Sequence, residues 1–267
     1  MATVSELTQA RELFRNLTLR ELRGKYKRSA LGWAWSMINP LATMGIFTVV
    51  FHFLINVEPD RGHPSGLKSF PFFLLCGLLP WNFLLNGLMN GMGAPLANGG
   101  LIKKVYFPRE VLTASVVAAW AVQFVIELAV LMIALLFVGN VAFAFIPGIL
   151  LVLVIQMFFT YGIALALGAL NVYFRDVQHF MGLFTQLWFY ATPVVYPLSL
   201  VEGHRSIYNV YKLNPMVRFV SMYRDLMYDL RWPPVYDLAY VLGCAILSVL
   251  IGRWIFLKLE PRFAEEL

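Results

Sequence analysis

The sequence changes abruptly from basic to apolar across Leu22-Arg23-Gly24-Lys25-Tyr26-Lys27-Arg28-Ser29-Ala30-Leu31-Gly32-Trp33-Ala34-Trp35. Four of its first seven residues are cations, and clustered cations do not enter hydrocarbon. From Leu31 to Val57 the chain then carries no Lys, Arg, Asp or Glu, a stretch long enough to cross a bilayer. The junction therefore predicts where the chain first enters a membrane and on which side its N-terminus lies.

The composition extends this prediction to the whole chain. Of its 267 residues 60% are hydrophobic and 13% are charged, and the mean hydropathy is +0.69, whereas soluble domains average about 45–50% apolar and about 25% charged. The net charge of +6 does not indicate nucleic acid, because the cations lie beside apolar stretches where anionic lipid and membrane topology explain them. Neither cysteine, Cys76 or Cys244, indicates a disulfide framework or a metal site, since both lie in apolar stretches.

Six apolar stretches predict an all-α polytopic membrane protein with six transmembrane helices, of which the fifth is the shortest. We expect residues 1–30 to form amphipathic interface helices and residues 31–267 to form one membrane domain. With the N-terminus inside, 14 Lys and Arg residues face inward and 7 outward, which favours cytosolic N- and C-termini. The six stretches are approximately Trp33–Val57, Phe70–Met92, Val111–Val138, Phe145–Leu170, Phe180–Pro197 and Val235–Leu257.

The N-terminal segment predicts amphipathic helix, because apolar residues from Leu7 to Leu17 recur at three- and four-residue spacing. Thr3 with Glu6, and Thr18 with Glu21, each fit a capping box, so we expect two short helices with a bend near Thr18. Such a segment anchors the chain in the headgroup layer and can also touch a cytosolic partner.

The segment 192–229 is too long and too apolar for a simple connector before the last stretch. Pro193, Pro197 and Asn214-Pro215 interrupt it, and broken helices at membrane depth persist only against protein or a water-filled cavity. We therefore expect a re-entrant exterior helical hairpin here.

Three common catalytic motifs are absent from the sequence. It contains no G-x-x-x-x-G-K-[ST] phosphate loop, no H-E-x-x-H and no G-x-S-x-G. The chain is therefore not expected to hydrolyse nucleotide by the P-loop route on its own. Within the apolar stretches, Glu127 shares a helix face with Gln123; this carboxyl is either a proton site or, as we prefer, part of a hydrogen-bonded helix contact.

The loop 93–110 mixes apolar and basic residues between Gly and Pro, which predicts a brief helix on the inner membrane face. Its apolar residues would need a groove to cover them, which favours a protein partner; the alternative is a basic interfacial loop. Aromatic residues make up 15% of the chain and gather at the ends of the apolar stretches, where they either form an interfacial belt or line a pathway for sugars.

Taken together, short motifs spread along nearly the entire chain resemble the permease subunit of type 2 ATP-binding-cassette exporters. The resemblance is to the branch that exports lipid-linked polysaccharides such as O-antigen, teichoic acid, capsule or galactan. The matching motifs are Tyr26-Lys27-Arg28-Ser29-Ala30-Leu31-Gly32-Trp33 with Trp35 and Pro40, Leu79-Pro80-Trp81, Lys103-Lys104-Val105-Tyr106-Phe107-Pro108-Arg109-Glu110, Asn171-Val172-Tyr173-Phe174-Arg175-Asp176-Val177, Thr192-Pro193-Val194-Val195-Tyr196-Pro197, Asn214-Pro215-Met216 and Tyr223-Arg224-Asp225.

This resemblance implies a permease homodimer that works with two copies of a separate cytosolic ATPase in the inner (plasma) membrane. The chain would then be a transport subunit without a catalytic site, metal or cofactor of its own, and ATP and Mg would bind the partner ATPase. A coupling helix between the second and third spans would contact that ATPase, and Arg175 and Asp176 would lie in the other cytosolic loop. The coupling residues would be Asn98, Leu101, Lys103, Lys104, Tyr106, Phe107 and Arg109.

The resemblance also suggests how cargo would pass. A lipid diphosphate would enter near the basic cluster, where cations receive phosphate, and its sugars would pass aromatic rings; membrane topology alone is the other explanation of these cations. The candidate entrance residues are Arg23, Lys25, Tyr26, Lys27 and Arg28, and the candidate channel rings are Trp33, Trp35, Phe47, Trp81, Tyr190 and Tyr196.

Two other functions remain open. One is an ATP-driven permease for a drug or a small lipid. The other, from a different class, is a membrane-embedded transferase acting on polyprenyl-linked sugars. Such a transferase would need acidic or His clusters at a membrane face, and Asp176 with His179, or Asp225 with Asp229, come nearest to one.

Overall fold

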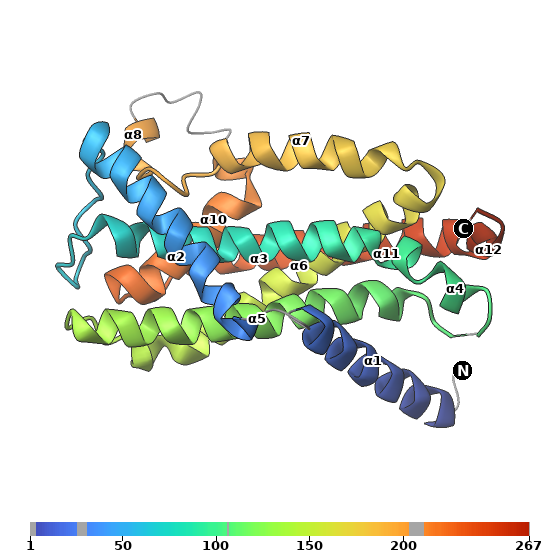
Figure 1. Cartoon of the computed structure of the whole chain (residues 1–267). Helices are drawn as coiled ribbons and strands as arrows, with labels where there is room; N and C mark the ends of the chain where they lie inside the picture. The colour runs from blue at the N-terminus through green and yellow to red at the C-terminus, as the bar shows by residue number, and fades with distance from the viewer. Residues whose placement is uncertain (1–3, 26–30, 106, 203–210, 267) are drawn as a thin grey trace.

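The computed structural model describes residues 4–25, 31–105, 107–202 and 211–266, and the described chain is helical with no strand. Long helices run roughly side by side, and the start of α1 lies at the same end as α4 and α12 (Figure 1). The elements are α1 (Val4–Lys25), η1 (Gly32–Ala34), α2 (Trp35–Phe47) continued by η2 (Thr48–Leu54), α3 (Phe70–Ala97), α4 (Gly99–Ile102), α5 (Glu110–Phe137), η3 (Ala142–Phe145), α6 (Ile146–Tyr173), α7 (Asp176–Tyr190), α8 (Ser199–Glu202), α10 (Pro215–Arg224), η4 (Asp225–Asp229), α11 (Val235–Leu259), η5 (Glu260–Arg262) and α12 (Phe263–Glu266).

Five described segments are long and apolar enough to cross a membrane: Trp35–Leu54, Phe70–Ala97, Glu110–Phe137, Ala142–Tyr173 and Val235–Arg262. They coincide with five of the six predicted stretches. The remaining stretch overlaps α7, whose 15 residues rise about 22 Å at 1.5 Å each, less than the roughly 30 Å of a hydrocarbon core. The structure therefore supports five spans by length, and α7 alone does not supply a sixth.

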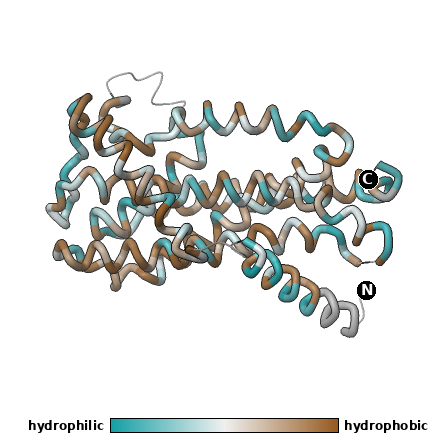
Figure 2. Tube along the Cα trace, viewed as in Figure 1, coloured by the Kyte–Doolittle hydropathy of each residue, from teal (hydrophilic) through white to brown (hydrophobic). Residues whose placement is uncertain are grey.

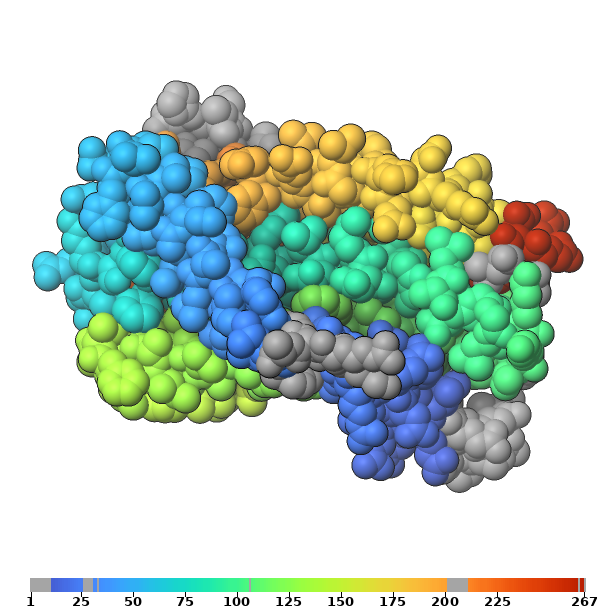
Figure 3. Space-filling model, in the orientation of Figure 1, coloured from blue at the N-terminus to red at the C-terminus, as the bar shows by residue number. Residues whose placement is uncertain are grey.

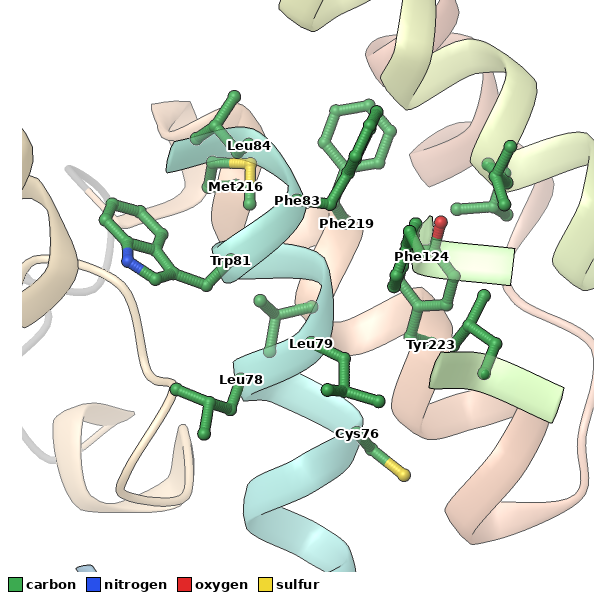
Figure 4. Close-up of a cluster of buried hydrophobic side chains, with 14 of the residues drawn as sticks. Cys76, Leu78, Leu79, Trp81, Phe83, Leu84, Phe124, Met216, Phe219 and Tyr223 are labelled. Carbon is green, nitrogen blue, oxygen red and sulfur yellow. The ribbon is translucent and has the colours of Figure 1, made fainter. Parts of the chain in front are cut away.

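The centre of the molecule is α3, which packs against α5, α6 and α10. Its apolar residues interlock with rings from the other elements; the rings of Phe83 and Phe124 stack at 5.1 Å, and Tyr223 meets Phe124 edge-on at 5.5 Å. Trp81 points away from this cluster on the other side of α3 (Figure 4). The helix therefore has one face against this cluster, whereas Trp81 on its other side packs against Trp188 and Phe189 of α7.

Two glycines allow α6 and α11 to approach closely. A Cβ built on Gly162 would overlap the backbone of Ser248 and Val249, and one built on Gly252 would overlap the carbonyl of Gly162. Small residues at helix crossings permit this approach in membranes, where apolar side chains gain little by leaving lipid.

The N-terminal segment differs from its prediction. It forms the single helix α1 rather than two short helices, and the Thr18 hydroxyl donates to the Phe14 carbonyl at 2.8 Å instead of capping a second helix. The prediction of a bend near Thr18 was therefore wrong, because a threonine inside a helix can satisfy its hydroxyl on the preceding turn. Thr3 lies outside the described residues.

The interrupted segment before α11 folds as α8, α10 and η4, and α10 begins at Asn214-Pro215 as the proline predicts. The Asn214 side chain accepts from the Met216 amide at 3.0 Å, which caps the first turn. Helix α10 is packed among α3, α6 and α11, so it lies inside the bundle rather than on its surface.

Hydrophilic residues gather at the α4 and α12 end of the molecule, whereas the middle of the bundle is mostly hydrophobic (Figure 2). Lys103, Lys104 and Glu265 are exposed there. This end is the part of the described chain best suited to water.

Candidate functional site: the groove along α3

A groove follows the outward face of α3 between α7 and the N-terminal helices (Figure 3). It contains two cavities that share Met89. The α1 cavity, of about 410 Å³, is bounded by α1, α3, α5 and Gln178 of α7. The α7 cavity, of about 350 Å³, lies between α3 and α7. We call the two cavities together the α3 groove.

Aromatic rings form one part of this groove. The Phe189 ring lies 5.4 Å from Trp81 and stacks on Phe47 at 6.1 Å. Trp81 and Tyr190 both line the α7 cavity. Three of the predicted channel rings, from α2, α3 and α7, are thus gathered around Phe189, which sequence reasoning did not single out.

The other predicted rings lie elsewhere or outside the description. The Tyr196 hydroxyl donates to the Tyr190 carbonyl at 2.6 Å and shares a hydrogen bond with the Tyr211 hydroxyl at 2.7 Å, at the α8 end of the groove. Trp35 begins α2 with 37% of its surface exposed and does not line the groove cavities. The side chain of Trp33 is not among those described.

Lys25, at the end of α1, reaches into the bundle. Its ammonium donates to Gln123 Oε1 and lies over the Trp120 ring. Gln123 in turn donates to Glu127 Oε1 at 2.6 Å, as expected for two residues on one helix face. Burial lowers the pKa of Lys25 to about 7, and the nearby Glu127 carboxyl opposes this shift. This cation therefore lines the α1 cavity while it is tied to α5.

The other residues of the predicted entrance cluster either lie at a separate cavity or fall outside the described residues. Arg23 is exposed and borders a separate open cavity of about 590 Å³ formed by α1. Tyr26, Lys27 and Arg28 lie outside the described residues. The structure therefore places Lys25 in the groove and Arg23 beside it.

The predicted coupling segment is compact. Asn98 ends α3 and accepts a hydrogen bond from Arg20 of α1 at 2.8 Å. Phe107 is buried among residues of α3, α5, α6 and α11, whereas Lys103 and Lys104 are exposed. The chain itself therefore covers Phe107, whereas Val105 of the same loop is exposed, and the coupling role of this loop stays a prediction. Leu101 is half-buried, and Tyr106 lies outside the described residues.

Two further contacts fix this end. Arg109 donates to the Glu260 carbonyl at 2.6 Å, and the Tyr173 hydroxyl donates to the Leu259 carbonyl at 2.8 Å. Arg175 and Asp176 are exposed at the start of α7, on the same side of the bundle. The predicted coupling and loop residues thus belong to one hydrophilic end.

At the opposite end, buried Arg224 binds the chain around Pro193. It donates to the carbonyls of Pro193 and Val194, each at 2.7 Å, and its guanidinium lies 3.6 Å from the centre of the Phe73 ring. Burial lowers the pKa of Arg224 to about 10, so it remains a cation at neutral pH. Arg224 therefore joins the turn after α7 to α10 and α3.

The acidic pair nearest to a transferase site is held by a cation instead. Arg231 Nη2 lies 2.6 Å from Asp225 Oδ1 and 3.4 Å from Asp229 Oδ2. Burial raises the pKa of Asp225 to about 6, although the hydrogen bond from Arg231 opposes the rise. These carboxyls are parts of a structural ion pair.

Sequence reasoning noted Gln186 only as a polar residue within the apolar stretches and overlooked the other amide side chains of the groove, among them Asn90 and Gln178. The signal was present as asparagines four residues apart on α3, at positions 82, 86 and 90. Asparagine carries no formal charge, so a search for charged residues within the apolar stretches does not find this pattern.

Apolar spans around an outward groove, with a hydrophilic end, define a multi-pass membrane protein of the transport class. The ABC-2 type transporter family model matches residues 12–228, and the chain belongs to that family.

The chain is similar to several named relatives. It is 32% identical to the O-antigen export system permease protein RfbA of Myxococcus xanthus, over 99% of this chain and 98% of the relative. It is 31% identical to RfbA of Klebsiella pneumoniae, over 93% and 92%. It is 25% identical to the polysialic acid transport protein KpsM of Escherichia coli, over 88% and 89%.

Proposed function

We propose that this chain is the permease subunit of an ATP-driven exporter for a polyprenyl-diphosphate-linked polysaccharide. The cargo would move from the cytosolic to the outer side of the inner (plasma) membrane. The observation that carries the proposal is the match to O-antigen export permeases along almost the whole chain. The ring-lined α3 groove supports a sugar cargo, because aromatic faces stack on the apolar faces of sugars while polar side chains bind hydroxyls.

The working unit would be a permease homodimer with two copies of a cytosolic ATPase that binds ATP and Mg. Closure of the ATPase dimer would push on the hydrophilic end, where the segment 98–109 is the first candidate to receive the motion. The hydrogen bond from Arg20 to Asn98 would pass that motion to α1. Both termini would then be cytosolic.

The entrance for the lipid diphosphate would lie beside α1. Arg23 is exposed and Lys25 lines the α1 cavity, so an anionic head group could be received where the groove begins. Replacing Lys27 and Arg28 by Gln tests the basic cluster: a loss of export at normal membrane insertion is expected, and normal export would remove its head-group role.

Deletion of the gene, followed by complementation, tests the main proposal. We expect surface polysaccharide to disappear and lipid-linked glycan to accumulate inside the cell, with both effects reversed by the wild-type gene. The tagged permease should copurify with a P-loop ATPase in equal amounts. Unchanged surface polysaccharide in the deletion strain would contradict the proposal.

A further inference from the structure

Two asparagines on α3 hold their side chains in a fixed orientation. The Nδ2 of Asn86 donates to the carbonyl of Asn82, and the Nδ2 of Asn90 donates to the carbonyl of Asn86, each at 2.8 Å. A carbonyl accepts only from the NH₂ group, so this bond also fixes which atom is oxygen. Each Oδ1 is therefore held as a hydrogen-bond acceptor, and no described residue donates to either one.

These asparagines lie on the groove face of α3. Asn90 lines the α1 cavity with Met89 and Gly93, and at 100° per residue position 86 falls on the same strip. Asn86 is half-buried and Asn90 is exposed. An amide facing hydrocarbon would cost several kcal/mol, so this strip requires a polar occupant.

A second row of polar side chains lies across the groove on α7. Gln178 lines the α1 cavity, and Gln186 and Tyr190 line the α7 cavity. Positions 178, 182, 186 and 190 repeat every four residues, so they share one helix face. The exposed apolar residues Phe180 and Leu187 lie on a neighbouring face of α7, about 100–120° around the helix from Gln186. Amides on both helices therefore face the same space.

The α7 cavity carries no charged side chain among its described lining residues, which are Trp81, Leu85, Met89, Gly182, Thr185, Gln186, Phe189 and Tyr190. In the α1 cavity the described charged residues are Glu21 and Lys25, both from α1. An anionic polymer crossing a low-dielectric region needs matching cations along its path. Amides and rings instead suit hydroxyl groups.

We propose that the amides of α3 and α7 form a binding track for the hydroxyl groups of an uncharged glycan. Fixed Oδ1 atoms of Asn86 and Asn90 accept from sugar hydroxyls, spaced about 6 Å apart along the helix axis. Gln178 and Gln186 bind the other side of the chain, and Trp81 and Phe189 contact its apolar faces. This inference rests on the proposed function and adds that the exported sugar units are neutral.

The first test is the chemistry of the glycan that accumulates inside a strain lacking the permease gene. We expect repeat units of neutral sugars. Repeat units that contain uronic acid, sialic acid or phosphate would overturn the inference while leaving the export function intact.

The second test replaces the acceptors. With the same strain, Asn86→Leu and Asn90→Leu should each lower the rate of surface glycan appearance about fivefold, from roughly one hydrogen bond lost per site. The double variant should lower it about 25-fold. Asn86→Gln and Asn90→Gln keep the amide and serve as matched controls that should retain more export than the Leu variants.

Membrane level, permease dimerisation by cross-linking and copurification of the ATPase are measured for every variant. Export at the wild-type rate in the double Leu variant would overturn the proposed binding track. Loss of the dimer in the Leu variants would also overturn it, since the strip would then bind a second copy of this chain. Failure of the wild-type gene to restore export would instead contradict the proposed function.

Discussion

At the scale of single residues, two buried amide side chains bind backbone carbonyls and fix the local structure. Asn140 donates to the carbonyl of Met227 at 2.7 Å, and Gln156 donates to the Pro80 carbonyl at 2.9 Å. The carbonyl of Pro80 thus has a partner within the core. Polar residues in membrane helices are expensive unless they are paired in this way.

Arg224 should be the most costly single residue to replace at the α8 end. In Arg224→Met, two backbone carbonyls and a ring lose their buried cation, and we expect a loss of about 3–5 kcal/mol in unfolding free energy. Thermal unfolding in detergent measures it. Arg61, which is exposed and donates to the Gly66 carbonyl at 3.2 Å, is the matched control; Arg61→Met should cost under about 0.5 kcal/mol. Equal losses of unfolding free energy in the two variants would contradict this role of Arg224.

Lys25 should make stability depend on pH. Its folded pKa is about 7, below the ordinary value of 10.5, so the unfolded chain binds more protons between these values. Stability should therefore rise with pH from about 7 towards 10 and level off below 7, where both states hold the proton. Lys25→Met should flatten this part of the profile, measured by unfolding at a series of pH values. Parallel profiles for wild type and variant would exclude Lys25 as the source.

At the scale of elements, hydropathy predicted the long helices well and their contacts poorly. The predicted stretch 70–92 became α3, which continues to Ala97 although Pro95 lies inside it. The prediction of a bend at Thr18 was wrong because the capping-box pattern has two explanations. The threonine can cap a new helix, or its hydroxyl can bond to the preceding turn of a continuous helix.

The residues that line the groove could likewise be predicted only in part from the sequence. Trp81, Tyr190 and Phe47 were predicted as channel rings, and the structure brings them together around Phe189. Which residues join them depends on how α2, α3 and α7 pair. That pairing is a tertiary property, and helix periodicity alone does not reveal it.

The contact between α6 and α11 should be sensitive to a single methyl group. Gly162→Ala and Gly252→Ala would each push the helix backbones apart, and we expect losses of about 1–3 kcal/mol from overpacking. Gly243 of α11 has open space around it, so Gly243→Ala is the matched control and should be close to neutral. Thermal unfolding of the three variants compares them. An unfolding temperature unchanged in Gly162→Ala would disprove the close approach.

At the scale of the whole molecule, the hydrophilic end and the apolar middle give the protein an axis. Exposed Lys103 and Lys104 lie at one end, and the ion pair between Lys68 and Glu58, 2.5 Å apart, lies in the connection between η2 and α3. That connection begins where the apolar segment Trp35–Leu54 ends. The segment Phe70–Ala97, which is long enough to cross a membrane, separates this connection from Lys103 and Lys104. The two sites should therefore face opposite sides of the membrane.

Cysteine labelling tests this orientation. In a variant whose Cys76 and Cys244 are replaced by Ala, a cysteine at position 68 should react with an impermeant maleimide added to spheroplasts with intact inner membranes. A cysteine at position 104 should react only after the membrane is permeabilised. Labelling of position 104 before permeabilisation would reverse the proposed topology.

The two long walls of the α3 groove are attached to the molecule very unequally. α3 is buried along most of its length, whereas the buried residues of α7 are Met181 and Thr185. Near its C-terminal end, α7 is tied by the hydrogen bond from Trp188 to Asn214 at 2.9 Å. A force that widens the groove would therefore displace α7, and the packed core would keep its shape. If glycan passes here as proposed, this unequal attachment would let the groove accept cargo of different widths.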